Sequence, residues 1–260
     1  MAHERVTRSG PAKDDAEAAA PLTTAFYASP GSGWRGWWTV LHPPYTAWHL
    51  SYVVIGASLA PAVNLGTMGA TLGAFFLAVG VAAHCLDELN GRPLRTSIPD
   101  SQLRAAAIAS LGLATALGAA GVLRVGVGLV PFIVVGAVLV VAYDLELVGG
   151  RLHNDVTFAA AWGAFPVLTA YFAQARTLGL AAVAAALGAL ALSGAQRHLS
   201  APARTLRRHV STVEGTVTMA DGATRPLSTE MLLAPLERAL KALCWATVAL
   251  AVALAVARLG

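Results

Sequence analysis

Ligand-capable side chains gather at the end of one long apolar run, at His84, Asp87 and Glu88. Their offsets of three and four residues place these groups on one face of a helix. Carboxylates at membrane depth can hold a hard cation such as Mg²⁺, and that cation can bridge phosphate oxygens. Arg92 and Arg95, just beyond, can clamp the same phosphates. We predict a phosphate site with Asp87 and Glu88 as metal ligands, but ordinary interfacial charges at a helix end would produce the same pattern.

Polar residues also follow two later apolar runs. Tyr143 and Asp144 end one run, and Asn154 with Asp155 is typical of the N-cap of the next helix. A basic cluster from 197 to 208 follows another run, and it either attracts anionic lipids or binds phosphate. The candidate catalytic residues are therefore Asp87, Glu88, Asp144 and Asp155. The candidate substrate-binding residues are His84, Asn90, Arg92, Arg95, Tyr143, Arg197, His198 and Arg204.

The composition indicates that membrane helices position these groups. Only 12% of the 260 residues are charged, 56% are hydrophobic and the mean hydropathy is +0.62, whereas soluble domains carry about a quarter charged residues. Uninterrupted apolar runs that lack Asp, Glu, Lys and Arg are long enough to cross a membrane, and lipid requires them to be helical. We predict an all-α polytopic transmembrane bundle of about seven spans, at 47–63, 67–86, 105–123, 125–143, 156–172, 178–195 and 240–257.

The distribution of basic residues predicts the orientation. Of the 18 Lys and Arg, only Arg124, Arg176 and Arg258 fall on the side of the C-terminus. The positive-inside rule then places the N-terminus in the cytoplasm and the C-terminus on the opposite side of the cell (inner) membrane. All 14 Asp and Glu fall on the cytoplasmic side too, which topology does not explain. The pI of about 9.4 follows from membrane topology, so we expect no nucleic-acid partner.

Two segments outside the spans are distinctive. Residues 1–30 mix charge, Ala, Ser and Pro without an apolar core, so we expect a disordered cytosolic tail before a transmembrane domain at 31–260. Residues 212–227 alternate around Asp221-Gly222, which predicts a small cytosolic β-hairpin. Cys85 and Cys244 fall at or inside spans, where buried thiols are favoured over a disulfide.

Four stretches between about 42 and 208 are similar to motifs of one family: His42-Pro43-Pro44-Tyr45, Arg92-Pro93-Leu94-Arg95 with Ile98-Pro99, Tyr143, and the stretch Trp162 to Tyr171. Together they resemble the UbiA superfamily of intramembrane prenyltransferases. The resemblance implies a helical bundle around a lipid-facing cavity, an isoprenyl diphosphate held at its cytoplasmic rim through Mg²⁺, and transfer of the isoprenyl group to an unidentified acceptor.

The chain departs from this family at both acidic motifs. His84 and Glu88 occupy the two Asp positions of the first motif, and Gln196, Arg197 and His198 stand where the second should be. We therefore expect a divergent prenyltransferase that acts on an isoprenyl diphosphate or a related polar-headed lipid. Two alternatives stay open: a membrane terpene cyclase on the same scaffold, and a non-catalytic lipid-binding or scaffolding protein that has lost the metal site.

Other classes of membrane protein fit less well. A retinal protein needs a lysine deep in its last helix, but the lysines here are Lys13 in the tail and Lys241 at the membrane edge. A transporter would have broken helices or charges at the midplane, and no predicted span has them. Membrane lipids are expected partners, and the sequence leaves assembly into a homo-oligomer open.

Overall fold

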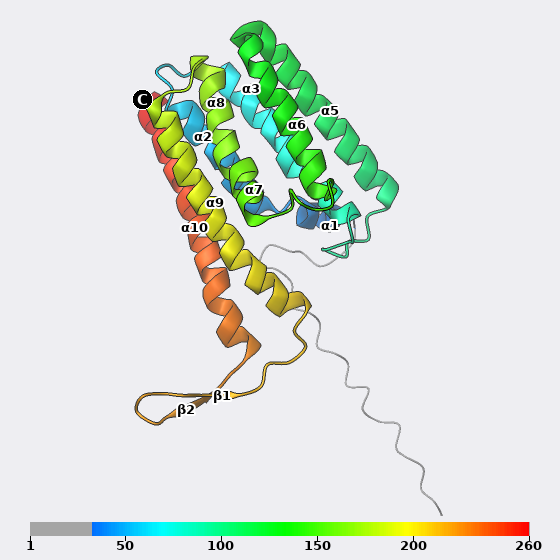
Figure 1. Cartoon of the computed structure of the whole chain (residues 1–260), viewed down its shortest axis with the longest axis vertical. Helices are drawn as coiled ribbons and strands as arrows, with labels where there is room; N and C mark the ends of the chain where they lie inside the picture. Colours follow the sequence, from blue (N-terminus) through cyan, green and yellow to red (C-terminus); the bar gives the residue numbers. More distant parts are fainter. Residues whose placement is uncertain (1–32, 260) are drawn as a thin grey trace, which may run out of the picture.

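The structure, a computed structural model, describes residues 33–259, so the tail predicted at 1–30 lies outside the described residues (Figure 1). The described chain is mostly helical. Its helices are α1 (Trp34–Val40), α2 (Pro43–Ser58), α3 (Leu65–Phe75), α4 (His84–Leu89), α5 (Asp100–Val125), α6 (Val130–Asp144), α7 (Asp155–Ala159), α8 (Phe165–Ala175), α9 (Leu180–Arg208) and α10 (Thr229–Leu259).

Six helical stretches among residues 33–259 are long and apolar enough to cross a membrane, which makes the chain a multi-pass membrane protein. Six of the seven predicted spans correspond to these stretches. The remaining predicted span, 47–63, corresponds to α2, which has only 16 residues. Pro61 shortens α2, because the residue before a proline is disfavoured in helical conformation. The six stretches are Leu65–Leu89, Asp100–Val125, Val127–Asp144, Asp155–Ala175, Leu180–Arg208 and Thr229–Leu259.

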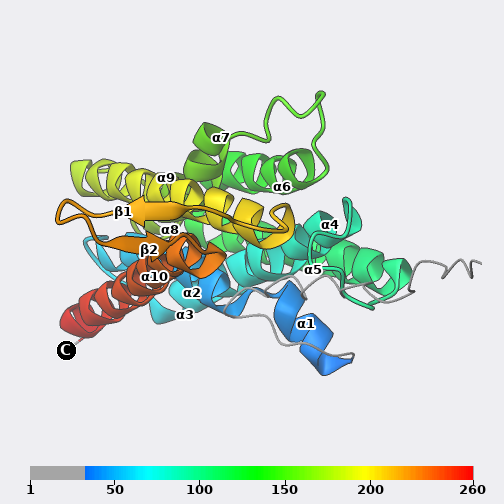
Figure 2. The ribbon, with the colours of Figure 1, turned by 90° about the horizontal axis from the view of Figure 1, so that it is seen from below.

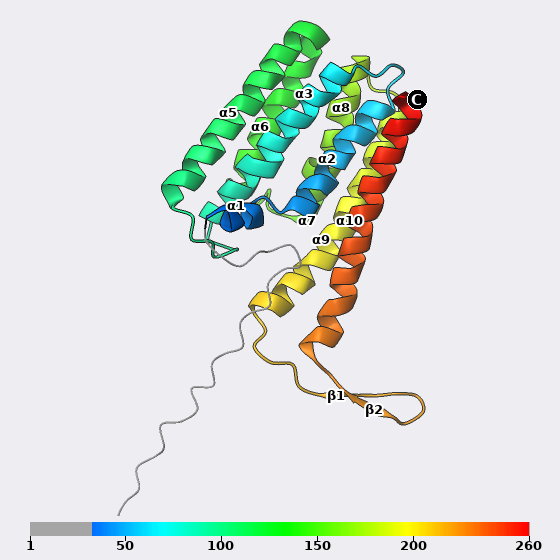
Figure 3. The same ribbon diagram turned by 180° about the vertical axis from the view of Figure 1, so that it is seen from behind.

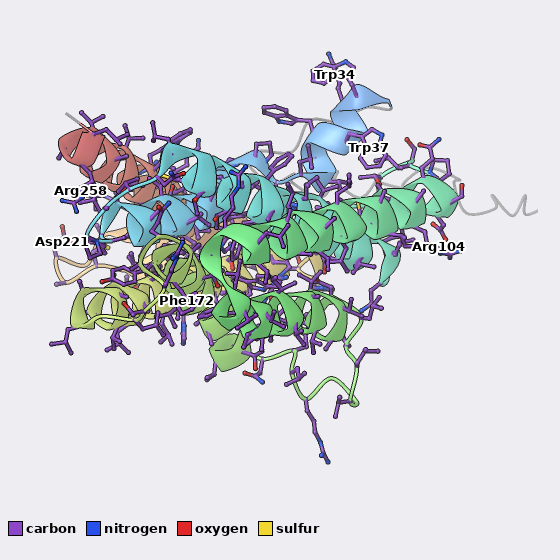
Figure 4. All side chains as sticks on the ribbon, turned by 90° about the horizontal axis from the view of Figure 1, so that it is seen from above. Trp34, Trp37, Arg104, Phe172, Asp221 and Arg258 are labelled. Carbon is purple, nitrogen blue, oxygen red and sulfur yellow. The ribbon has the colours of Figure 1, made fainter. Side chains whose placement is uncertain are left out.

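The helices stand side by side, and the loops after α4, α6 and α9 lie at one end of the bundle, the lower end in Figure 1. The C-terminus lies at the opposite end (Figures 1 and 3). This arrangement agrees with the predicted alternation of the loops. Short α1 also lies at the lower end and carries Trp34 away from the bundle (Figure 4), where the indole is 69% exposed. An exposed Trp at this level is typical of a membrane interface.

The last two helices are longer than a membrane is thick. α9 has 29 residues and α10 has 31, so at 1.5 Å per residue they are roughly 44 and 47 Å long. A hydrocarbon core is about 30 Å thick. Both helices therefore project beyond the others at the lower end, where they carry the hairpin (Figures 1 and 2).

The predicted hairpin is confirmed. β1 (Thr216–Thr218) pairs antiparallel with β2 (Thr224–Pro226). Gly222 has a φ of +84°, which a residue without a Cβ adopts at little cost. The Asp221 carboxylate accepts a hydrogen bond of 2.9 Å from the Ala223 backbone N–H, which closes the turn.

Helix α2 is the centre of one half of the bundle and packs against α8 and α10. Trp48 and Tyr52 are fully buried, and the Trp48 indole N–H donates to the Tyr52 hydroxyl at 2.6 Å. Gly56 lies directly against the backbone of Val167, where a Cβ would collide with the carbonyl. Small residues allow such close packing of membrane helices. The two free thiols, Cys85 and Cys244, are both buried, as expected.

Two helices widen into π-helical turns where they face the centre of the bundle. These turns are Phe76–Ala83, between α3 and α4, and Ala160–Ala164, between α7 and α8. Val79 from the first turn and Trp162 from the second belong to one buried cluster. Single π-turns inside α-helices frequently occur at functional sites. The space that Val79 and Trp162 border is therefore a candidate for a functional site.

Candidate functional site

A polar cavity of about 160 Å³ lies at the lower end of the bundle. Its walls come from α2 and the residue before it, α4, α6, α7 and the loop before it, α9 and the two π-helical turns, so segments far apart in the sequence contribute to it. The lining residues are His42, Tyr45, His49, Val79, Ala83, His84, Asp87, Tyr143, Asp144, His153, Phe158, Trp162, Gln196, Arg197, Ser200, Arg204, Arg207 and Arg208.

Arginines dominate the charge of this polar cavity. Arg197, Arg204, Arg207 and Arg208 come from the last turns of α9. Arg207 is paired with Glu237 of α10. Arg204 donates no hydrogen bond to any residue between 33 and 259, and it lies close enough to Arg208 for their charges to repel. Guanidinium groups of like charge at one mouth are stabilised by an anion, and phosphate suits their geometry.

Three buried polar atoms of residues that line the cavity have no hydrogen-bond partner among the described residues. They are the Tyr143 hydroxyl, Asp144 Oδ2 and Gln196 Oε1. All three residues are less than a tenth exposed. A buried polar atom without a hydrogen bond costs roughly 1–3 kcal/mol, so native proteins almost always provide a partner. The described residues therefore leave three polar groups unsatisfied close to the cavity wall.

Aromatic rings line the inner part of the polar cavity. Tyr143 stacks on His153 with centroids 4.5 Å apart, and it meets Trp162 edge-on at 5.8 Å. The Arg197 guanidinium lies 5.4 Å from the centroid of Phe158. Aromatic faces attract cations. The polar cavity therefore combines an arginine-rich mouth with an aromatic interior.

A second, apolar cavity of about 330 Å³ adjoins the polar one. It lies between α3, α5, α6 and α8, and its wall includes Leu117, Phe132 and Phe165. Val79 and Trp162 line both cavities, so the two cavities border each other at the π-helical turns. The apolar wall continues to Thr67 and Arg124 near the opposite end of the bundle, which gives the pair of cavities the shape that an amphipathic ligand requires.

The structure brings together part of the predicted site. His84, Asp87, Tyr143, Asp144, Arg197 and Arg204 all line the polar cavity. These residues were predictable because they lie at the ends of helices that the topology places on the same side of the membrane. Residues of separate helices therefore meet, as the sequence analysis expected.

The prediction that Asp87 and Glu88 point together needs correction, because Glu88 does not share the face of Asp87. It is fully buried, and its carboxylate accepts hydrogen bonds from the backbone N–H groups of Leu94 and Thr96, both at 2.9 Å. The Thr96 hydroxyl donates a third, of 2.8 Å. Glu88 therefore holds the loop after α4, and Asp87 alone of the pair faces the cavity. The spacing in the sequence did not reveal that the loop folds back onto Glu88.

Arg92, Arg95 and Asn90 also lie outside the cavity lining. Arg92 donates to the carbonyls of Thr96 and Ile98 and pairs with Asp100, so it stabilises the same loop. Arg95 is exposed. Asn90 donates through Nδ2 to the Asp144 carbonyl at 3.2 Å, so its contact with the site is indirect. The predicted phosphate clamp by Arg92 and Arg95 is not formed in this structure.

Asp155 and His198 flank the site from outside. The Asp155 carboxylate accepts a bond of 2.8 Å from Arg197 Nε, and its side chain is 54% exposed. It therefore orients Arg197. Asn154 caps α7, as predicted, by accepting a bond from the Thr157 N–H at 2.9 Å. His198 bonds to the carbonyl of Gly194 on its own helix.

Several residues that line the cavity were not predicted from the sequence, among them His49, His153 and Phe158. His49 lies inside an apolar run and bonds through Nδ1 to the Trp162 carbonyl at 2.9 Å. An ionisable residue inside a predicted span is itself a signal of function, and it was available in the sequence. His42 precedes α2, and burial, with the neighbouring His84 next in importance, lowers the pKa of His42 well below its usual value.

The residues fit a divalent cation only in part. No group of three or more His, Cys, Asp or Glu that could hold a metal occurs within residues 33–259. Asp87 and Asp144 both line the cavity and lie close enough for their charges to interact. Mg²⁺ is commonly held by one or two carboxylates together with substrate phosphates. The donor chemistry of Asp87 and Asp144 fits this role, whereas Glu88 does not.

No protein-family model, curated protein or solved structure matches this chain. The likeness to prenyltransferases therefore rests on the sequence motifs alone.

Proposed function

We propose that the protein binds a lipid with a phosphate-bearing head, whose head occupies the polar cavity and whose chain occupies the apolar one. The observation that carries this proposal is that the two cavities share Val79 and Trp162 as lining residues. Arg197 and Arg204 supply positive charge for the head, and the apolar wall between α3, α5, α6 and α8 supplies contacts for the chain. Burial of the chain contributes roughly 0.8 kcal/mol per CH₂ group.

The ligand and reaction proposed are an isoprenyl diphosphate and transfer of its isoprenyl group to an acceptor, in keeping with the prenyltransferase-like motifs. Arginines at the mouth would stabilise the charge that develops on the diphosphate as it leaves. Faces of Tyr143 and Trp162 would attract the allylic cation and shield it from water. Mg²⁺, if bound at Asp87 and Asp144, would further neutralise the diphosphate. The cytoplasmic side of the inner membrane is the proposed location of the mouth.

A non-catalytic lipid-binding role is the second candidate. The observation in its favour is the engagement of Glu88, whose three hydrogen bonds leave it unable to join Asp87 in holding a metal. A lipid-binding protein needs the two cavities and the arginines but no metal. The same ligand is therefore expected for both candidates, and only product formation separates them.

The test uses the full chain in lipid nanodiscs with radiolabelled farnesyl diphosphate as the probe. We expect saturable binding that farnesol, which lacks the phosphates, does not compete. Arg204→Gln should weaken binding about tenfold or more, because it removes a charge-assisted contact. Arg225→Gln, on the exposed hairpin, is the matched control and should bind normally.

Three results decide between the candidates. Consumption of farnesyl diphosphate with release of diphosphate supports an enzyme, and stable binding without turnover supports the lipid-binding role. Absence of saturable binding, or equal competition by farnesol, contradicts both.

A further inference from the structure

The outward face of α10 carries an ordered series of side chains. α10 lies at the edge of the bundle (Figures 1 and 3) and packs against α2 and α9. Its buried residues include Leu240, Cys244, Thr247 and Ala251, which mark the inner face. On the opposite face, exposed residues follow one another at offsets of three and four, in the order Arg238, Lys241, Trp245, Ala249, Val252 and Val256. One face of one helix therefore presents two basic groups, then an indole, then an aliphatic surface.

The basic groups lie at the level where the hydrocarbon core of a membrane ends. From Lys241 to Leu259, where α10 ends, the helix rises roughly 27 Å at 1.5 Å per residue. This rise is close to the thickness of a hydrocarbon core, which is about 30 Å. Arg238 precedes Lys241 by one turn and therefore lies in the headgroup layer. Trp245, one turn further into the membrane, is 59% exposed, as is typical of an indole at the membrane interface.

The charge of this outward face is positive. Glu237, the acid nearest to Arg238 in the sequence, pairs with Arg207 of α9, so its carboxylate is engaged on another side of the helix. Lys and Arg side chains close to a membrane surface attract anionic lipids, and both donate charge-assisted hydrogen bonds to phosphate. A zwitterionic headgroup carries a positive charge as well as its phosphate and gains less here. The face is therefore complementary in charge to an anionic lipid.

We propose that Arg238, Lys241 and Trp245 form a binding site for an anionic phospholipid of the surrounding bilayer. Its phosphate contacts Arg238 and Lys241, its glycerol region lies against Trp245, and an acyl chain follows the aliphatic surface of Val252 and Val256. None of these residues lines the polar cavity. The site is therefore separate from the one proposed for the prenyl lipid and does not depend on it.

Trp245 can report on the lipid that contacts it. The full chain is placed in nanodiscs of phosphatidylcholine with a rising mole fraction of phosphatidylglycerol whose acyl chains are brominated and quench indole fluorescence on contact. The signal of Trp245 is the difference between the wild type and Trp245→Phe. A parallel titration uses brominated phosphatidylcholine. We expect half of the quenching of Trp245 to be reached at a mole fraction of the anionic lipid about tenfold or more below that of the zwitterionic lipid.

Substitutions locate the source of this preference. Arg238→Gln and Lys241→Gln should each lower it about fivefold, because each removes one charge at the membrane surface. Arg104→Gln is the matched control, since Arg104 is exposed near the start of α5, away from α10 (Figure 4). It removes the same charge from the same end of the bundle and should leave the preference unchanged.

Three results would overturn the proposal. Equal titration curves for the two lipids would show that α10 does not select an anionic headgroup. A preference that survives both substitutions on α10, or that falls as much in Arg104→Gln, would show only the general attraction of a basic protein. Protection of Trp245 from both brominated lipids would show that a protein surface, such as a second copy of the chain, covers this face.

Discussion

The carboxylate of Glu88 accepts two hydrogen bonds from Thr96, one from the backbone N–H at 2.9 Å and one from the hydroxyl at 2.8 Å. This pair fixes the loop that follows α4, and Arg92 reinforces it through the carbonyls of Thr96 and Ile98. The neighbouring residues Asp87 and Glu88 therefore have different roles. Glu88 organises the loop, whereas Asp87 faces the cavity.

Substitution of these two acids should separate stability from binding. Glu88→Gln replaces an accepting oxygen by a donor beside backbone N–H groups, so the free energy of unfolding should fall by roughly 1–3 kcal/mol. Asp87→Asn should change stability little but alter the affinity for farnesyl diphosphate. Thermal unfolding in nanodiscs and equilibrium binding measure the two effects. Equal loss of stability in both variants would contradict this division of roles.

Gly56 should tolerate no side chain. A Cβ at this position would collide with the backbone carbonyl of Val167, so Gly56→Ala should force α2 away from α8 and lower the unfolding free energy by about 1–3 kcal/mol. Gly69 on α3 is the matched control, since nothing lies within 4 Å of a Cβ built there. Gly69→Ala should leave the unfolding temperature unchanged. A stable Gly56→Ala variant would show that the two helices are not in such close contact.

The apolar cavity should set which chain lengths bind. Ala137 lines it, whereas its neighbour Val138 is 56% exposed on the outer side of α6. Ala137→Phe should weaken binding of farnesyl diphosphate more than binding of the shorter dimethylallyl diphosphate. Val138→Phe should affect neither, because it faces outward. Competition binding with both diphosphates provides the measurement, and an equal loss for short and long chains would argue against a chain in this cavity.

His42 should make stability sensitive to acid. The pKa of His42 in the folded protein lies well below the usual histidine value of 6.5, first because of burial and then because of His84. The protonated form is thus disfavoured in the folded state, so the contribution is complete above pH 6.5 and is lost as the pH falls below it. The slope from one group is at most about 1.4 kcal/mol per pH unit.

His42→Asn isolates this effect. Asn does not titrate, and it tolerates the left-handed backbone found at residue 42, where φ is +44°. As the pH is lowered from 7 to 5, the wild type should lose stability relative to the variant. Parallel pH profiles of the unfolding temperature would refute the assignment to His42.

The fold was predictable from the sequence in its main features, because lipid permits few structures for uncharged apolar runs. Six predicted spans correspond to helices that are long and apolar enough to cross a membrane, and the hairpin around Asp221-Gly222 is confirmed. The length of α2 was not predicted, since the apolar run passes through Pro61 while the helix ends at Ser58. The π-helical turns were also missed, because they depend on packing between helices and have no pattern in the sequence.

The candidate site was predictable only where topology determined it. Asp87, Tyr143, Asp144, Arg197 and Arg204 lie at helix ends on one side, and they meet in the polar cavity. Glu88, Arg92 and Arg95 lie outside the cavity lining, because the loop after α4 folds back onto its helix through hydrogen bonds between residues that are not close in the sequence. Periodicity along one helix contains no information about them.

Photoaffinity labelling tests the central claim most directly. The probe is a farnesyl diphosphate analogue with a diazirine at the end of its chain, and labelled peptides are mapped by mass spectrometry. We predict labels between residues 111 and 140, in α5 and α6, that unlabelled farnesyl diphosphate competes and that Arg204→Gln reduces. Labels only on exposed outer residues such as Leu250 and Val252, without competition, would contradict a lipid head in the polar cavity with its chain in the apolar one.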